Sequence, residues 1–238
     1  MKKIAALLFL AVLPIMAMSQ DRLKTSNYLH GKATTDYEFA VERLLDAKPT
    51  ALWGYLVKPS FSPEYALFCY KGQTGSELVL TKAKENIWYA KERRNQVKID
   101  SIGLRINNSL ADSIAAFFKY AVSTSVVYPG YGPFTIDTDY YGNKTVYDDI
   151  GLDGTTYMFI NEGYAAECWS PHDGLCVELV KIGNELVKAV EQKDINGVYK
   201  VADMLQGPLN SLWELLPDWY KEYIEIKTEM KARGTIFP

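Results

Sequence analysis

The sequence of 238 residues predicts an α+β fold, in which an antiparallel sheet is built from two blocks of strands, each followed by helix, with a helical C-terminus. Two observations favour this class. Short apolar runs in the ranges 51–106 and 134–169 are separated by tight turns such as Gly142-Asn143, which pair consecutive strands antiparallel. Apolar residues at helical spacing follow each block. We expect the helices to cover one face of the sheet.

The elements before residue 126 begin with a helix whose capping box has Thr35 as N-cap and Glu38 three residues later. Pro49 ends this helix. The first block then contains predicted strands at 51–58, 65–71, 77–83, 87–91 and 97–106. Asn108 or Ser109 caps a second helix.

The elements after residue 133 begin with predicted strands at 134–141, 144–150, 155–160 and 164–169. Ser170 then has the character of an N-cap, Pro171 suits the first helical position, and Asp173 complements the helix dipole. We therefore predict that a helix begins at Ser170 and that the remaining chain is helical, with breaks at Pro208 and Pro217 and a stop at Gly234.

The first nineteen residues have the order of a secretory signal peptide. Lys2 and Lys3 precede an apolar run over 4–16, and Ala17-Met18-Ser19 provides small residues for cleavage. The run is too short to span a bilayer. We expect residues 1–19 to be a signal peptide cleaved near Ser19, residues 20–238 to form a single α+β domain, and the protein to be exported to the periplasm or the medium.

Charge and motif content exclude several classes of function. The formal net charge is −3 and no basic block is present, which argues against a nucleic-acid partner. Gly130-Tyr131-Gly132 lacks the remainder of a phosphate-binding loop, so no nucleotide cofactor is expected. The stretch from Asp137 to Asp148 partly matches a calcium loop, but Tyr141 is a poor ligand for a hard cation. The turn favours a hairpin, and we predict neither a metal nor a membrane span.

The three cysteines are Cys69, Cys168 and Cys176. In an exported protein Cys168 and Cys176 are close enough in sequence to form a disulfide across a short loop. The alternative is that both are buried core residues, because free cysteine is among the most buried residue types. Cys69 lies in a strand-like run and is expected to be buried.

Tyrosine is the outlier of the composition, with 17 residues. Aromatic side chains are common on strand faces, but tyrosine also serves half-exposed recognition surfaces. Pro129 and Pro133 stiffen an aromatic loop, which would present its rings at a low cost in entropy. The predicted binding residues are Tyr128, Tyr131, Phe134, Tyr140 and Tyr141. They favour a non-catalytic module that recognises a glycan or a protein.

Two other classes of function stay open. A secreted hydrolase would use paired carboxylates, or Cys168 as a nucleophile with His172 as its base. The candidate carboxylates cluster near turns and are Asp148, Asp149, Asp153 and Glu162. A structural protein of the cell envelope is the third alternative.

Two segments resemble exported α+β proteins of gut Bacteroidota that have no assigned activity. One is Trp53 to Phe61 continuing through Pro63 to Leu67, and the other is Leu152 to Tyr157 leading to Trp169-Ser170-Pro171. The resemblance implies export and a mixed fold, and it assigns no functional residue.

Overall fold

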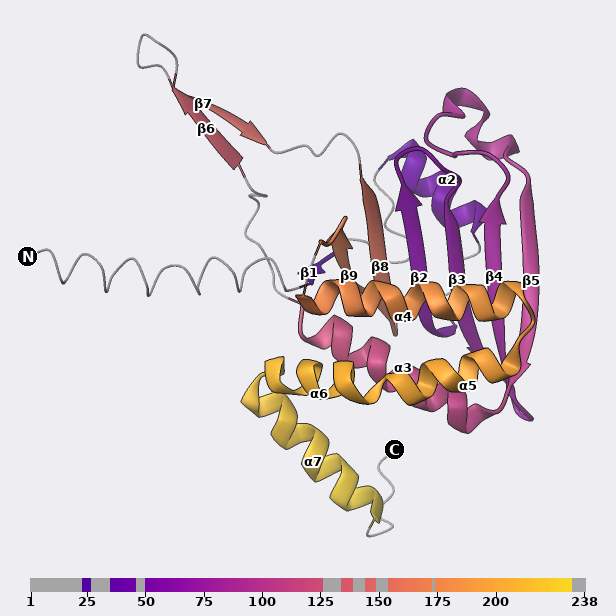
Figure 1. The fold of residues 1–238 in the computed structure, drawn as a ribbon, viewed down its shortest axis with the longest axis vertical. Helices are drawn as coiled ribbons and strands as arrows, with labels where there is room; N and C mark the ends of the chain where they lie inside the picture. The colour runs from indigo at the N-terminus through magenta and orange to yellow at the C-terminus, as the bar shows by residue number, and fades with distance from the viewer. Residues whose placement is uncertain are drawn as a thin grey trace, which may run out of the picture.

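The computed structural model describes residues 23–26, 35–45, 50–125, 134–138, 144–148, 154–172 and 174–232. The strands of its main sheet are β1 (Lys24–Thr25), β2 (Ala51–Pro59), β3 (Tyr65–Lys71), β4 (Ser76–Ala83), β5 (Ile99–Ile106), β8 (Thr155–Asn161) and β9 (Tyr164–Trp169). They lie in the order β1-β9-β8-β2-β3-β4-β5, and every neighbouring pair is antiparallel (Figure 1). The predicted α+β class with an antiparallel sheet is confirmed.

The two predicted blocks of strands join along β2 and β8, which pair from Trp53 opposite Asn161 to Pro59 opposite Thr155. β2 therefore lies inside the sheet, and residues 53–57 are all buried. Because neighbouring side chains of a strand point to opposite faces, this continuous burial requires cover on both faces. The expectation that helices cover only one face was wrong.

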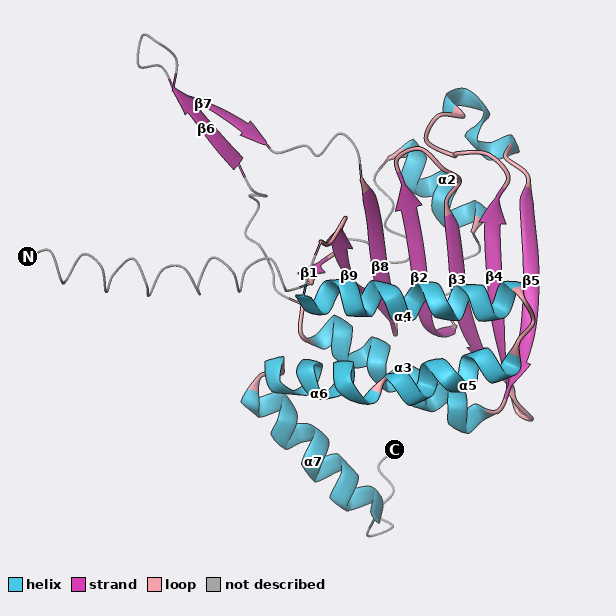
Figure 2. Cartoon of the chain, in the orientation of Figure 1, coloured by secondary structure: helices cyan, strands magenta, loops and turns pink. Residues whose placement is uncertain are grey.

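One face of the sheet carries α3 (Asn108–Ser123) and α4 (Gly174–Glu191), on which α5 (Ile195–Met204) and α6 (Gln206–Leu215) pack (Figure 2). α7 (Asp218–Ala232) follows α6. The core on this face includes Trp53, whose indole stacks on Phe118 with 4.5 Å between ring centroids. Among the described helices, none is long and apolar enough to cross a bilayer.

Tyr55 links β2 to α4. Its hydroxyl donates a hydrogen bond to Asn184 Oδ1 at 3.1 Å, and its ring is fully buried. Gly183 allows the helix to approach this ring, because a Cβ at that position would lie 2.6 Å from two ring carbons of Tyr55. A glycine in the middle of a helix is otherwise unfavourable, so its presence here is explained by the close contact.

The opposite face is covered by α2 (Asp36–Leu44) and by the segment that contains the short 3₁₀ helix η1 (Lys91–Gln96). The predicted capping box is confirmed, because Thr35 Oγ1 accepts from the Glu38 N–H and the Thr35 N–H donates to the Glu38 carboxylate. Residues 87–91 were expected to form a strand. They form a turn that leads into η1, and Ile87 is buried beneath it.

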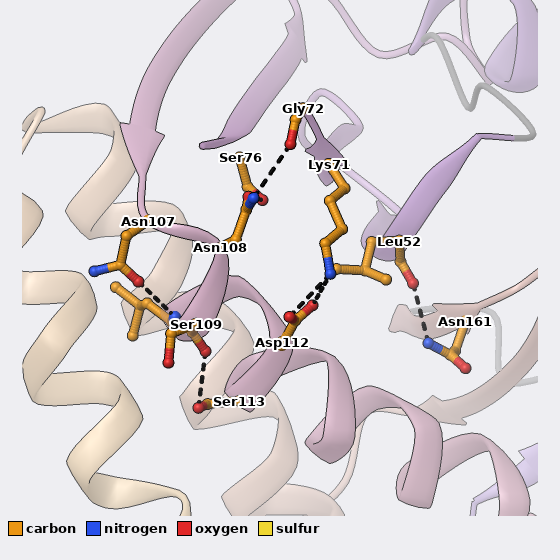
Figure 3. A network of polar contacts seen from close by, with 11 residues as sticks. Leu52, Lys71, Gly72, Ser76, Asn107, Asn108, Ser109, Asp112, Ser113 and Asn161 are labelled. Carbon is orange, nitrogen blue, oxygen red and sulfur yellow. Dashed lines mark hydrogen bonds and ion pairs between the residues drawn. The ribbon is translucent and has the colours of Figure 1, made fainter. Parts of the chain in front are cut away.

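Polar contacts fix the start of α3 against the turn between β3 and β4 (Figure 3). Asn107 is the observed N-cap, one residue before the predicted position, and its side chain accepts from the Leu110 N–H at 2.7 Å. Asn108 donates to the carbonyl of Gly72 at 3.2 Å. Lys71 and Asp112 form an ion pair at 2.7 Å, which ties β3 to the second turn of the helix.

Two regions of the second block differ from the predicted strands and helix. Among the described strands, β6 (Phe134–Thr138) and β7 (Lys144–Asp148) pair only with each other, as a hairpin whose turn lies outside the described residues. The predicted N-cap Ser170 does not cap a helix, because α4 begins at Gly174. Ser170 has a positive φ of 35°, and its hydroxyl accepts from the Thr155 N–H at 2.8 Å.

Burial predicts a loss of stability at alkaline pH. It raises the pKa of Tyr37 and Tyr55 well above the ordinary value of 10.0, and the pKa of Tyr65 to about 12. The contribution of these buried phenols to the free energy of unfolding is therefore complete below pH 10. It decreases as the pH rises through their pKa values in the folded protein. We expect the free energy of unfolding, measured by urea titration, to fall steadily between about pH 10 and 12. A constant value over this range would contradict the burial of these phenols.

Candidate functional site

Two connections meet at the end of the sheet where β2 and β4 finish, toward the top of Figure 1. One is the turn 60–64 between β2 and β3, and the other is the segment 84–98 between β4 and β5. The base of the longer segment is closed by a hydrogen bond from the Lys84 N–H to the Lys98 carbonyl at 2.9 Å. The two connections therefore emerge side by side from paired strands.

Asn86 joins the two connections. Its side-chain nitrogen donates to the carbonyl of Ser62 at 2.8 Å, and at 3.4 Å to the carbonyls of Pro59 and Ser60. Its side-chain oxygen accepts from the Tyr89 N–H at 3.0 Å. One amide side chain thus fixes the turn 60–64 against the backbone at Tyr89.

Glu64 also fixes the segment 84–98. Its side chain is fully buried and accepts three hydrogen bonds, from the Ile87 N–H at 2.7 Å, the Trp88 N–H at 3.2 Å and the Tyr37 hydroxyl at 3.1 Å. A buried carboxylate is tolerated only when it is well paired, and these three donors supply that pairing. The backbone at residues 87–88 is therefore fixed to the residue that precedes β3 and, through Tyr37, to α2.

Arg94 completes the support. Its guanidinium donates to the carbonyls of Ile87 at 3.2 Å and Trp88 at 3.1 Å. The same group lies over the rings of Trp88 and Tyr37, at 5.6 and 5.9 Å from their centroids. The two rings meet edge to face at 5.1 Å. Trp88 is thus held by both its backbone and its ring.

The result is an exposed aromatic surface, which we define as Phe61, Trp88 and Tyr89. Their exposed fractions are 69%, 54% and 55%. The rings of Phe61 and Tyr89 lie nearly parallel, with an interplanar angle of 14° and 6.5 Å between centroids. Rings that are exposed but rigidly supported lose little entropy when a ligand covers them.

Trp169 adds an exposed ring at the same end of the sheet, with half of its surface accessible. Its indole lies on Gly154, where a Cβ would be 2.5 Å from the indole nitrogen. Gly154 is in turn bonded to Ser60, the neighbour of Phe61, through the Ser60 N–H to the Gly154 carbonyl at 2.9 Å. This contact brings the start of β8 next to the turn 60–64.

Polar side chains lie beside the aromatic surface. A hollow of about 560 Å³ between α2 and η1 is lined by Asp36, Phe39, Lys91, Glu92, Arg94 and Asn95. Arg94 belongs both to this hollow and to the support of Trp88. Carboxylate, ammonium and amide groups therefore line a hollow that adjoins Trp88, whereas the guanidinium of Arg94 is already bonded to the carbonyls of Ile87 and Trp88.

A second hollow of about 530 Å³ lies where β1 and the turn between β8 and β9 approach α3 and α7. Its wall includes Lys119, Glu162 and Tyr164. Several hydroxyl groups in this wall are bonded to one another, such as Ser123, which donates to Tyr220 at 3.3 Å. Because these groups already have partners, the hollow offers a ligand fewer open polar groups than its composition implies.

The predicted binding residues are not placed by the described part of the structure. Tyr128, Tyr131, Tyr140 and Tyr141 lie outside it, and Phe134 begins β6, where no side chain is described. Those predictions stay untested. The aromatic surface was missed, because residues 87–91 were interpreted as a strand. The available indication was the short apolar run Ile87-Trp88-Tyr89-Ala90, which is flanked on both sides by charged and polar residues.

The alternative catalytic residues are only partly described. Asp149 and Asp153 lie outside the described residues, and Glu162 lies in the second hollow. A hydrogen bond with Cys176, together with burial, raises the pKa of the Cys168 thiol far above its ordinary value. A nucleophilic cysteine needs the opposite shift, so this environment disfavours attack by Cys168.

The chain belongs to no family that the comparisons identify. No protein-family model matches it, and no curated protein or solved structure is significantly similar to it. Within the described residues, no group of three or more His, Cys, Asp or Glu side chains is placed to hold a metal ion. The resemblance to exported Bacteroidota proteins stays a prediction.

Proposed function

We propose that the protein is a binding module that recognises a polysaccharide through the aromatic surface. The observation that carries this proposal is the exposure of Phe61, Trp88 and Tyr89 on a backbone fixed by Asn86 and Glu64. Exposed large aromatic side chains on a rigid support are typical of recognition sites, because the rings supply contact area without ordering costs. The C–H faces of a sugar ring pack well against such rings.

A carbohydrate fits the neighbouring groups better than a protein partner does. The large exposed apolar side chains at this end are aromatic, and the hollow that adjoins Trp88 carries Asp36, Glu92 and Asn95. Carboxylate and amide groups beside an aromatic ring can bind the hydroxyls of a sugar while its apolar face is stacked. A stable protein interface buries about 800 Å² on each partner, usually around a broader apolar centre.

The proposal includes export. Lys2, Lys3 and the apolar run over 4–16 support a signal peptide cleaved near Ser19, which would bring the mature domain to polysaccharides outside the cytoplasm. Amino-terminal sequencing of the protein from its native host tests this point, and an intact Met1 would contradict it.

Replacement of Tyr89 or Phe61 by alanine is expected to weaken polysaccharide binding by about tenfold or more, because each removes one of the two stacked rings of the surface. The measurement is a screen of the purified protein against an array of neutral and acidic polysaccharides, followed by calorimetric titration of the best ligand. Trp219→Ala is the matched control, since Trp219 is an equally exposed ring on the distant helix α7.

Three results would overturn the proposal. These are the absence of binding across the array, binding that Phe61→Ala and Tyr89→Ala leave unchanged, and binding that Trp219→Ala weakens equally. If the same rings bind a protein ligand instead, the partner is a protein and not a polysaccharide.

A further inference from the structure

Cys168 and Cys176 are brought together by the end of β9 and the first turn of α4. Both side chains are buried, and their thiols share a hydrogen bond. No disulfide joins them in the structure. Both residues belong to the same buried cluster of the core, and proximity of the two side chains is the first requirement for a disulfide.

The chain between them accounts for this arrangement. Ser170 and Gly174 both have a positive φ, of 35° and 68°. The Ser170 hydroxyl accepts from the Thr155 N–H, and the Ser170 N–H donates to the Thr155 carbonyl at 2.9 Å. These contacts hold Ser170 against the start of β8, four residues before α4 begins.

We infer that Cys168 and Cys176 are a dithiol pair that a low-molecular-weight disulfide, such as glutathione disulfide, converts to an intramolecular disulfide. In the first step a thiolate of the pair attacks one sulfur of glutathione disulfide, which forms a mixed disulfide and releases one glutathione. The second protein sulfur then displaces the other glutathione. The two thiol protons leave on the two glutathione molecules, and the protein loses two electrons that glutathione disulfide gains.

Burial determines the rate of this reaction. Because the side chains of Cys168 and Cys176 are buried and the Cys168 thiolate is disfavoured, attack requires transient local opening at the end of β9 and the first turn of α4. We expect oxidation to be slower than that of an exposed thiol and to accelerate as the pH rises from 7 to 9. Once formed, the disulfide would be sheltered from reductants by the same burial.

Cys69 provides an internal reference. It lies in β3, three strands from β9 in the sheet, and burial raises the pKa of its thiol to about 12. Its side chain shares a hydrogen bond with Ser76. Cys69 is therefore expected to stay reduced while the pair oxidises.

The test counts thiols by mass spectrometry. Full-length protein is incubated with glutathione disulfide, denatured in acid, and then labelled with N-ethylmaleimide under denaturing conditions. We expect three labels before oxidation and one afterwards, with the remaining label on Cys69. Cys69→Ser should change from two labels to none, whereas Cys176→Ser, or Cys176→Ala if the serine variant folds poorly, should never form the internal disulfide.

Stability gives a second readout. The closed loop is short, and we expect oxidation to raise the Tm by about 4–10 °C, an increase that dithiothreitol reverses. The inference is overturned if the oxidised protein still takes three labels, if the disulfide includes Cys69, or if glutathione stays attached to Cys168 or Cys176 as a mixed disulfide.

Discussion

Replacing Glu64 by alanine is expected to lower the free energy of unfolding by about 3–5 kcal/mol. The carboxylate is fully buried and is the common acceptor for the backbone N–H groups of Ile87 and Trp88 and for the Tyr37 hydroxyl. Its removal leaves three donors without their acceptor in a site that water cannot easily enter. Urea unfolding followed by circular dichroism measures the change.

The matched control is Glu85→Ala in the same segment. Glu85 forms an exposed ion pair with Arg93 at 3.3 Å, and such pairs contribute less than about 1 kcal/mol. Glu64→Gln should lie between the two, because the amide keeps an acceptor oxygen but places an NH₂ group toward a donor. If Glu64→Ala and Glu85→Ala destabilise equally, the buried network does not hold the segment.

Replacing Gly183 by alanine is expected to lower the free energy of unfolding by about 1–3 kcal/mol, although alanine is the better helix former. The added methyl group would overlap the ring of Tyr55. That ring cannot move easily, because its hydroxyl is bonded to Asn184 and its centroid lies 5.4 Å from that of the buried Phe159 ring. α4 would have to move away from the sheet, and thermal unfolding should show the loss.

Gly207→Ala is the control for this helix–sheet contact. Gly207 lies in α6, and a Cβ there would meet no atom within 4 Å. The free energy of unfolding should stay constant or rise by a fraction of about 1 kcal/mol, because only helix propensity changes. Equal effects at positions 183 and 207 would show that Gly183 is not a contact point between α4 and Tyr55.

Local patterns predicted the elements whose stability depends on neighbouring residues in sequence. The capping box of Thr35 and Glu38 is such a case, and the hairpins around β3 and β8 follow from short turns. The helix start at Ser170 was mispredicted because a contact with Thr155 on a neighbouring strand, fifteen positions away, decides the conformation of Ser170. The prediction of a strand at residues 87–91 was wrong for the same reason, because the Ile87 N–H donates to Glu64 rather than to a neighbouring strand.

The candidate site was predicted only in its general chemistry. The tyrosine content indicated aromatic recognition, but the location of the aromatic surface depends on contacts between distant parts of the chain. Asn86 reaches back to Ser62, Tyr89 packs beside Phe61, and Gly154 bonds to Ser60. Contacts between residues that are 24 to 94 positions apart produce no periodic pattern in the sequence.

The closed base of the segment 84–98 makes this part of the protein a natural scaffold for engineering. β4 and β5 keep one register from Ser76 opposite Ile106 to Ala83 opposite Ile99, and the Lys84–Lys98 hydrogen bond ends the ladder. Positions 61, 88 and 89 can therefore be randomised in a combinatorial library while the buried anchors are retained. Selection from such a library would yield new ligand specificities without redesign of the sheet.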